Sequence, residues 1–372
     1  MLSFWESDFY TSYDHIVVGS GIVGLSTALS IREKLPNARV LVLERGHFPT
    51  GASTKNAGFA CFGSLSEIAA DLEKLSEEEV LKLVQLRWEG LQLLRQRLTD
   101  EAIDFRNYGG YELLRANEVG VLEQMDRVNT LLKPLFGQPV YSLVNERIES
   151  FGFPKSRVEA LVFNPFEAQI HSGRMMKRLT ALATSKGVEV MTGAQVVAFE
   201  EQSGCVEVAL ANGPKLRAGQ LVFCTNAFTR YFFPHADLEP GRGVVLVTQP
   251  IEGLKLKGTY HYDEGYYYFR NYENRVIFGG GRNLDLKTEN TTDFNINDRI
   301  LNQLKSDLQE LILPDTRVEI DRVWTGIMAF GPNKKPIVER VSPRITMGVR
   351  LGGMGVAIGS KIGQQLAEIV CQ

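Results

Sequence analysis

Several features that mark specialised classes of protein are scarce or missing in this chain. The four cysteines are scattered and form no CxxC pair, which argues against a disulfide framework and a zinc site and suits a reducing cytoplasm. No run approaches the ~18 consecutive apolar residues of a membrane span. The first 13 residues contain acids but no basic region, so we do not expect a signal peptide. The net charge of −3 points neither to nucleic acid nor to an anionic membrane surface.

What is present is ordinary for a globular enzyme. The chain has 372 residues, enough for two domains, with 44% hydrophobic and 23% charged residues. The five histidines are isolated in the sequence, so we expect no metal site. We find no internal repeat, and nothing in the sequence indicates the oligomeric state.

The most informative stretch runs from Asp14 to Arg45 and has the order strand, glycine turn, helix, strand. An apolar run at residues 16–18 precedes the GxGxxG turn at residues 19–24. A helix is expected from Leu25 to Arg32, and a second apolar strand from Val40 to Leu43 ends in Glu44. This is the order of a dinucleotide-binding βαβ unit.

Each part of that unit has a physical role. Gly19 permits the tight turn, Gly21 lets a pyrophosphate approach the backbone, and Gly24 allows the helix to pack on its strand. The free N–H groups of the helix N-terminus favour phosphate. Glu44 follows Gly24 by 20 residues and can accept hydrogen bonds from a ribose hydroxyl, which favours NAD or FAD over NADP.

The rest of the chain alternates between helical and strand patterns. We expect helices at 118–135, at 298–311 with Asn297 as N-cap, and after a capping box at 76–79. A helix with Ser172 as N-cap is followed by a strand at 188–191. From about residue 240, aromatic β-runs predict a second sheet, in which Tyr266, Tyr267 and Tyr268 point alternately to opposite faces.

Near the C-terminus, a strand at 345–349 leads through a glycine turn at 352–355 into a helix that reaches Val370. The N-terminus of this helix can stabilise negative charge on a bound ligand.

Taken in order, these motifs resemble the D-amino-acid oxidase superfamily of FAD enzymes over nearly the whole chain. Ser3-Phe4-Trp5-Glu6 ahead of the turn resembles the γ-glutamylputrescine oxidase branch of that superfamily. The resemblance implies an α/β fold, with a Rossmann-type FAD-binding domain and a second α+β substrate domain that contains a large mixed β-sheet. Its FAD domain would comprise residues 1–85, 151–230 and 323–372, and its substrate domain residues 86–150 and 231–322.

The resemblance also implies which residues bind the cofactor. Glu44 would meet the adenosine ribose, Arg45 would lie near the adenine, and the backbone of Val196 would contact it. The full expected set is Gly19, Ser20, Gly21, Ile22, Val23, Gly24, Glu44, Arg45, Ser53, Thr54, Lys55, Asn56, Ala57, Val196, Thr225, Asn226, Gly326, Ile327, Gly353, Met354, Gly355 and Val356.

The chain departs from the patterns of several branches of the superfamily. The flavin-linking cysteine of sarcosine oxidases is missing near residues 324–326, and the flavin-linking histidine of dimethylglycine dehydrogenases is missing from residues 53–58, so we expect FAD to bind noncovalently. The position of the substrate-binding arginine of glycine oxidases is occupied by Met328, and that of the oxygen-activating lysine of sarcosine oxidases by Ile277.

We therefore expect oxidation of the C–N bond of a small amine or amino acid, by hydride transfer to flavin N5 and hydrolysis of the imine. The electron acceptor is oxygen or another oxidant that the sequence does not specify. No catalytic residue is assigned; candidates for the substrate face are Lys55, Arg242, Tyr268 and Arg270.

Two alternatives stay open at this stage. One is FAD-dependent oxidation of a 2-hydroxy acid on the same fold. The other is a flavin-bearing, non-catalytic subunit of a larger complex.

Overall fold

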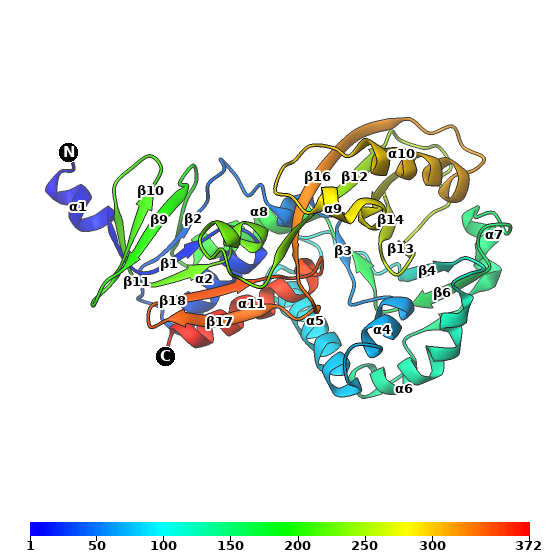
Figure 1. The fold of residues 1–372 in the computed structure, drawn as a ribbon, viewed down its shortest axis with the longest axis horizontal. Helices are drawn as coiled ribbons and strands as arrows, with labels where there is room; N and C mark the ends of the chain where they lie inside the picture. Colours follow the sequence, from blue (N-terminus) through cyan, green and yellow to red (C-terminus); the bar gives the residue numbers. More distant parts are fainter.

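The computed structural model describes residues 1–372 and contains two large sheets, each with its own helices (Figure 1). Both chain termini lie in the half that holds the first sheet, and the long strand β16 (Ile320–Phe330) runs toward the other half (Figure 1). None of the helices combines the length and the apolar character that a membrane span requires.

The first sheet is built around β1 (Ser12–Val18), which lies parallel to β2 (Val40–Leu43) and β11 (Leu216–Phe223). Beyond them, β8 (Val188–Met191) and β18 (Ile345–Val349) extend the sheet in parallel. Three antiparallel strands complete it: β17 (Ile337–Ser342), β9 (Val196–Glu201) and β10 (Val206–Leu210). The central strands are apolar on both faces because both faces are covered.

Four helices belong to the core on one face of this sheet: α2 (Ile22–Lys34), α5 (Glu77–Leu98), α8 (Ser172–Ser185) and α11 (Gly355–Val370). Helix α2 is buried on all sides from Ile22 to Ile31, because it lies between the sheet and α11. Glycines allow this close approach, since a Cβ at Gly363 would lie 2.6 Å from Ser26 Cβ.

The second sheet is mixed. Neighbouring strands within it are antiparallel except for one parallel pair, β13 with β4. The strand order is β16, β12 (Glu239–Thr248), β15 (Arg275–Gly280), β14 (Tyr267–Tyr272), β13 (Thr259–Tyr262), β4 (Gly110–Leu114), β6 (Ala160–Asn164) and β5 (Ser142–Leu143).

One face of the second sheet carries an aromatic core. Tyr260, Tyr262, Tyr267 and Phe269 pack there with apolar residues of α10 (Asp298–Asp307). Because strand side chains alternate, His261 and Tyr268 point to the opposite face.

The remaining elements are short or lie at the periphery. The helices are α1 (Phe4–Tyr10), α3 (Ala52–Lys55), α4 (Leu65–Leu72), α6 (Met125–Phe136), α7 (Ile148–Phe151) and α9 (Leu286–Glu289). A small two-stranded sheet pairs β3 (Phe59–Ala60) with β7 (Ala168–Gln169). The single turns are η1 (Val119–Gln124), η2 (Asn145–Arg147), η3 (Asn226–Tyr231), η4 (Arg282–Asp285) and the π-turn η5 (Leu308–Ile312).

The fold class expected from the sequence is confirmed, and some element boundaries are corrected. The helix expected at 118–135 is the 3-10 turn η1 followed by α6, and the one expected at 298–311 ends at Asp307 before η5. The N-cap of α8 is His171, whose Nδ1 accepts from the Arg174 N–H at 3.2 Å. Ser172 does not cap because its hydroxyl donates to Asn56 at 2.7 Å.

The chain crosses between the two sheets more often than the expected domain ranges suggest. Strand β6 falls within the range 151–230 and most of β16 within 323–372, yet both strands belong to the second sheet. The domain boundaries therefore stay predictions.

Candidate active site

A cavity of about 840 Å³ is lined by residues from both sheets. All of the expected cofactor residues line it except Ser20, Gly21, Gly24 and Thr54. The structure thus brings together segments from opposite ends of the chain, from Gly19 to Val356.

The nucleotide turn at one end of the cavity depends on glycine. Gly19 has φ +103°, a conformation that side chains disfavour. A Cβ at Gly24 would lie 1.8 Å from the Gly19 carbonyl oxygen, so no larger residue fits without moving the backbone. Gly21 caps α2 without a side-chain hydrogen bond, which leaves the helix N-terminus suited to a phosphate.

Glu44 is buried at the end of β2 and is held in one orientation. Its carboxylate accepts from the Ser20 hydroxyl at 2.6 Å, the Ser20 N–H at 3.2 Å and the Gly46 N–H at 2.9 Å. Ser20 therefore orients Glu44 and does not itself face the cavity. Next to it, the Arg45 guanidinium lies 3.9 Å from the centre of the Phe228 ring.

The loop at 51–58 forms the short helix α3 and reaches back to α2. Ser53 Oγ accepts from the Ile22 N–H at 3.0 Å. Thr54 donates to the Pro49 carbonyl at 2.9 Å, so it holds the loop together and does not line the cavity. Asn56 lines the cavity and also accepts from the Gly58 N–H at 2.8 Å.

Strand β16 and the start of α11 form a further part of the cavity wall. Trp324 Nε1–H donates to the Lys55 carbonyl at 2.9 Å, which fixes the loop against β16. Helix α11 begins beside the cavity with no side-chain cap at Met354, so its N–H groups and dipole face the space.

Of the four candidates for the substrate face, Lys55 and Tyr268 line the cavity. Lys55 Nζ lies 5.2 Å from the centre of the Phe294 ring. Tyr268 packs edge-on against Phe59, and burial raises its pKa to about 12. Tyr266 also lines the cavity whereas Tyr267 is in the aromatic core, which confirms the expected alternation.

Arg242 does not line the cavity, although it was expected as a candidate. It forms two hydrogen bonds of 2.8 Å with Glu289, which is fully buried. Glu289 also accepts from Asn297 at 2.8 Å. Arg242 is therefore part of a buried ion pair beneath the second sheet.

Arg270 is likewise structural. It donates to the carbonyls of Ala57 and, at 3.0 Å, Ile170, and thereby holds the end of the 51–58 loop. Burial lowers its pKa to about 10. The sequence predicted Arg270 as a polar strand residue near the substrate, but its N–H groups donate to the Ala57 and Ile170 carbonyls instead.

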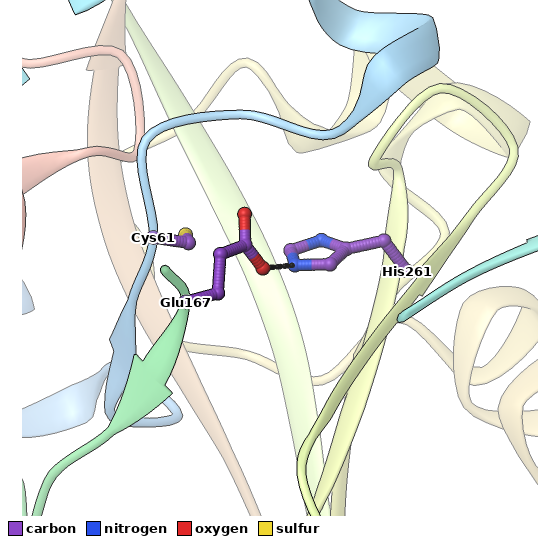
Figure 2. Close-up of side chains that lie close together, drawn as sticks. All are labelled: Cys61, Glu167 and His261. Carbon is purple, nitrogen blue, oxygen red and sulfur yellow. Dashed lines mark ion pairs between the residues drawn. The ribbon is translucent and has the colours of Figure 1, made fainter. Parts of the chain in front are cut away.

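The sequence did not indicate a buried cluster of Cys61, Glu167 and His261, of which Cys61 and His261 line the cavity (Figure 2). Glu167 lies between Cys61 and His261, with His261 Nε2 3.3 Å from its carboxylate. Burial opposes protonation of His261, but Glu167, Glu67 and Glu112 outweigh it and raise the histidine pKa. Burial raises the pKa of the Cys61 thiol well above its usual value. The carboxylates thus favour the protonated form of His261 beside Glu167. The alternation of His261 with Tyr260 and Tyr262 along β13 was the available sequence signal.

A second cavity residue was missed. Arg282 follows the glycine run 279–281, and its guanidinium lies 3.9 Å from the centre of the Phe330 ring. No apolar helix follows the glycine run, so its sequence does not predict a second nucleotide turn and carries no other sign of a role for Arg282.

Comparison with known proteins identifies the family. Residues 14–369 match the DAO family model, described as FAD dependent oxidoreductase. A curated relative from Haemophilus influenzae, named "Probable oxidoreductase OrdL", is 24% identical over 375 residues, covering 96% of this chain and 82% of the relative.

Two solved structures share the fold. L-proline dehydrogenase from P. horikoshii has a TM-score of 0.78 at 19% identity, covering 97% of this chain and 93% of that chain. Glycine oxidase from Geobacillus kaustophilus has a TM-score of 0.77 at 19% identity, covering 97% of this chain and 95% of that one. With the nucleotide turn, the fixed Glu44 and the cavity between two sheets, these matches show that the chain belongs to the DAO family of FAD-dependent oxidoreductases.

Proposed function

We propose that this protein oxidises the C–N bond of a small amine or amino acid and releases an imine that water hydrolyses. The observation that supports this most strongly is the continuous cavity, which runs from the nucleotide turn to the aromatic and charged wall of the second sheet. The two structural neighbours named above are enzymes named for amino acids, glycine and proline.

The residues at the nucleotide end fit FAD. The Gly19–Gly24 turn is packed too tightly for side chains at Gly19 and Gly24, as a turn against a pyrophosphate requires. The N-cap of α2, Gly21, has no side chain to bond the N–H groups of the first turn, and of these groups the Ile22 N–H donates to Ser53. Glu44 would accept hydrogen bonds from the ribose, and Arg45 with Phe228 would lie near the adenine. Bound FAD supplies the hydride acceptor of the reaction.

The chain itself would orient the substrate and exclude water. Tyr268 has no hydrogen-bond acceptor in the protein and borders the cavity, so its hydroxyl is available to a substrate. Phe59 and Met328 add apolar surface beside it. We assign no catalytic base, because hydride transfer from a neutral amine does not require one.

We further propose that FAD is bound noncovalently. The cavity-lining cysteine and histidine side chains, of the types that link flavins, are Cys61, Cys224 and His261. Burial raises the pKa of the Cys61 thiol well above its usual value and that of the Cys224 thiol to about 12, which makes both poor nucleophiles. His261 Nε2 faces Glu167. Acid precipitation should therefore release all of the flavin into the supernatant.

Anaerobic reduction of the bound flavin tests the proposal. The FAD-loaded protein is mixed with primary and secondary amines, γ-glutamylated amines, D- and L-amino acids, N-methyl glycines and 2-hydroxy acids. Bleaching of the visible flavin absorbance by an amine or amino acid supports C–N oxidation. Bleaching by a hydroxy acid alone supports the alternative oxidation, and a flavin that nothing reduces supports the non-catalytic subunit.

A further inference from the structure

Arg282 is positioned by residues at the end of β15 and on strands β12 and β16. It follows Gly281, which has φ +75°, at the end of β15. Its side chain crosses Gly241 of β12 and stacks on Phe330 of β16. A Cβ at Gly241 would lie 2.4 Å from the Phe330 ring and 3.5 Å from Arg282 Cδ, so glycine leaves the space that both side chains use.

Unlike its neighbours, Arg282 has no partner for its charge. Arg242 is bound to Glu289, and Arg350 lies 2.6 Å from Asp237. No carboxylate of the chain lies within ion-pair distance of Arg282, and no acceptor takes a hydrogen bond from its N–H groups. The side chain is half-buried, and burial lowers its pKa even though the charges of Tyr266 and Glu289 act in the opposite direction from a greater distance. A partly buried guanidinium without an acceptor is costly unless a ligand supplies one.

The stacking of Arg282 on Phe330 leaves the guanidinium N–H groups free to donate hydrogen bonds. When the flat face of a guanidinium lies on an aromatic ring, its N–H groups point outward along its edge. That edge can form two parallel hydrogen bonds with a carboxylate. Arg282 and Phe330 both line the cavity, so a ligand inside it can reach this edge.

The place of Arg282 also matters relative to Met328. Met328 and Phe330 share one face of β16, because strand residues alternate. Met328 Sδ lies 3.8 Å from the position of a Cβ at Gly353, in the turn expected to face the flavin. Arg282 therefore brings a cation to this face from the start of η4, next to a position of β16 where the chain has an apolar residue.

We propose that Arg282 binds a carboxylate of the substrate, so that the enzyme prefers amino acids to amines that lack an anionic group. This inference rests on the proposed C–N oxidation, because only that reaction makes the bound carboxylate part of a substrate. The carboxylate site itself can be tested without turnover.

The binding test uses the FAD-loaded protein with butyrate and with neutral butyramide as probes. Binding is measured from the change in flavin absorbance and from the shift in melting temperature. Wild type should bind butyrate better than butyramide. Arg282→Gln should weaken butyrate binding by about 10- to 100-fold and leave butyramide unchanged, since a hydrogen bond to a charged group is worth about that much. Arg282→Lys should be intermediate, because it keeps the charge but loses the paired geometry.

Lys74→Gln is the matched control, since Lys74 is an exposed cation that also lines the cavity. It should bind butyrate as wild type does. Equal butyrate binding by wild type and Arg282→Gln, with both proteins folded and flavin-loaded, would overturn the assignment. An equal loss in Lys74→Gln would also overturn it, by showing a general effect of charge.

A reduction test separates this inference from the proposed function. Flavin reduction by amino acids, with the amine at the α- or the ω-position, is compared with reduction by the matching amines that lack the carboxylate. A carboxylate preference that disappears in Arg282→Gln supports both ideas. An unchanged preference contradicts the role of Arg282 but leaves C–N oxidation standing. If no amine or amino acid reduces the flavin, the proposed function fails, and the butyrate result alone decides on the carboxylate site.

Discussion

The two ends of the cavity are built in different ways. At the nucleotide end, backbone geometry dominates: Gly19 and Gly24 meet at a distance no side chain allows, and Glu44 is fixed by hydrogen bonds from Ser20 and Gly46. At the substrate end, side chains from distant segments provide the chemistry, among them Tyr268 and Arg282. The difference suggests that substitutions at the first end abolish the cofactor site, whereas substitutions at the second end change the specificity of a folded protein.

The largest effect is expected at the nucleotide end. Gly24→Ala places a methyl group 1.8 Å from the Gly19 oxygen, which forces α2 away from β1. We expect a loss of about 4 kcal/mol or more in the free energy of unfolding and no bound flavin. Urea unfolding and the flavin absorbance of the purified protein measure both. Gly120→Ala, where a Cβ would meet nothing within 4 Å, is the control; a stable, yellow Gly24→Ala protein would break the comparison.

The next largest effect lies behind the substrate end and separates structural charge from substrate-binding charge. Arg242→Met leaves the fully buried Glu289 without its cation and should cost about 3–5 kcal/mol of unfolding free energy. The double variant Arg242→Met with Glu289→Leu should recover most of that loss, as followed by urea unfolding. If Arg242→Met is stable and alters only substrate binding, Arg242 belongs to the site after all.

A smaller effect depends on pH. Burial raises the pKa of Glu112 to about 7 although Ser64 and Ser66 hydrogen-bond to it, and its neighbour His261 also has a raised pKa. Both groups hold protons more tightly in the folded state. The free energy of unfolding should therefore fall by on the order of 3 kcal/mol as pH rises from about 4.5 to 7, because of Glu112. It should fall further above pH 6.5, as His261 loses its proton.

Glu112→Gln cannot release that proton, so it should flatten the fall in unfolding free energy between pH 5 and 7. Glu78→Gln is the control: its exposed carboxyl pairs with Lys82 and has a lowered pKa, so its contribution lies at more acidic pH. An unchanged slope in Glu112→Gln would show that Glu112 is ionised in the folded protein.

The smallest effect is expected from Tyr268→Phe, which removes one hydroxyl that faces the cavity and contacts no acceptor. Flavin content and melting temperature should stay the same, while the substrate concentration for half-maximal flavin reduction rises by about 5- to 10-fold. Loss of flavin from this variant would show that the two ends of the cavity are not separable.

The same contrast explains which features the sequence predicted. The nucleotide turn is local: a strand, three glycines and Glu44 lie within about thirty residues, so their spacing carries the geometry. Arg242 and Arg270 resembled substrate-face residues, but their partners Glu289 and Ile170 are distant in sequence and could not be assigned. Arg282 was overlooked because its stacking on Phe330 depends on Gly241, in a third strand.

The central claim is that the substrate loses electrons from a C–N bond. The most direct test is a single anaerobic turnover of the FAD-loaded protein with the substrate found in the reduction panel, followed by measurement of released ammonia or amine. C–N oxidation predicts one molecule of ammonia or amine released for each flavin reduced or, for a cyclic amine, one ring-opened product that carries both the amine and the new carbonyl group. Full reduction of the flavin without release of any nitrogen-containing product would contradict it and point to oxidation of a C–O bond.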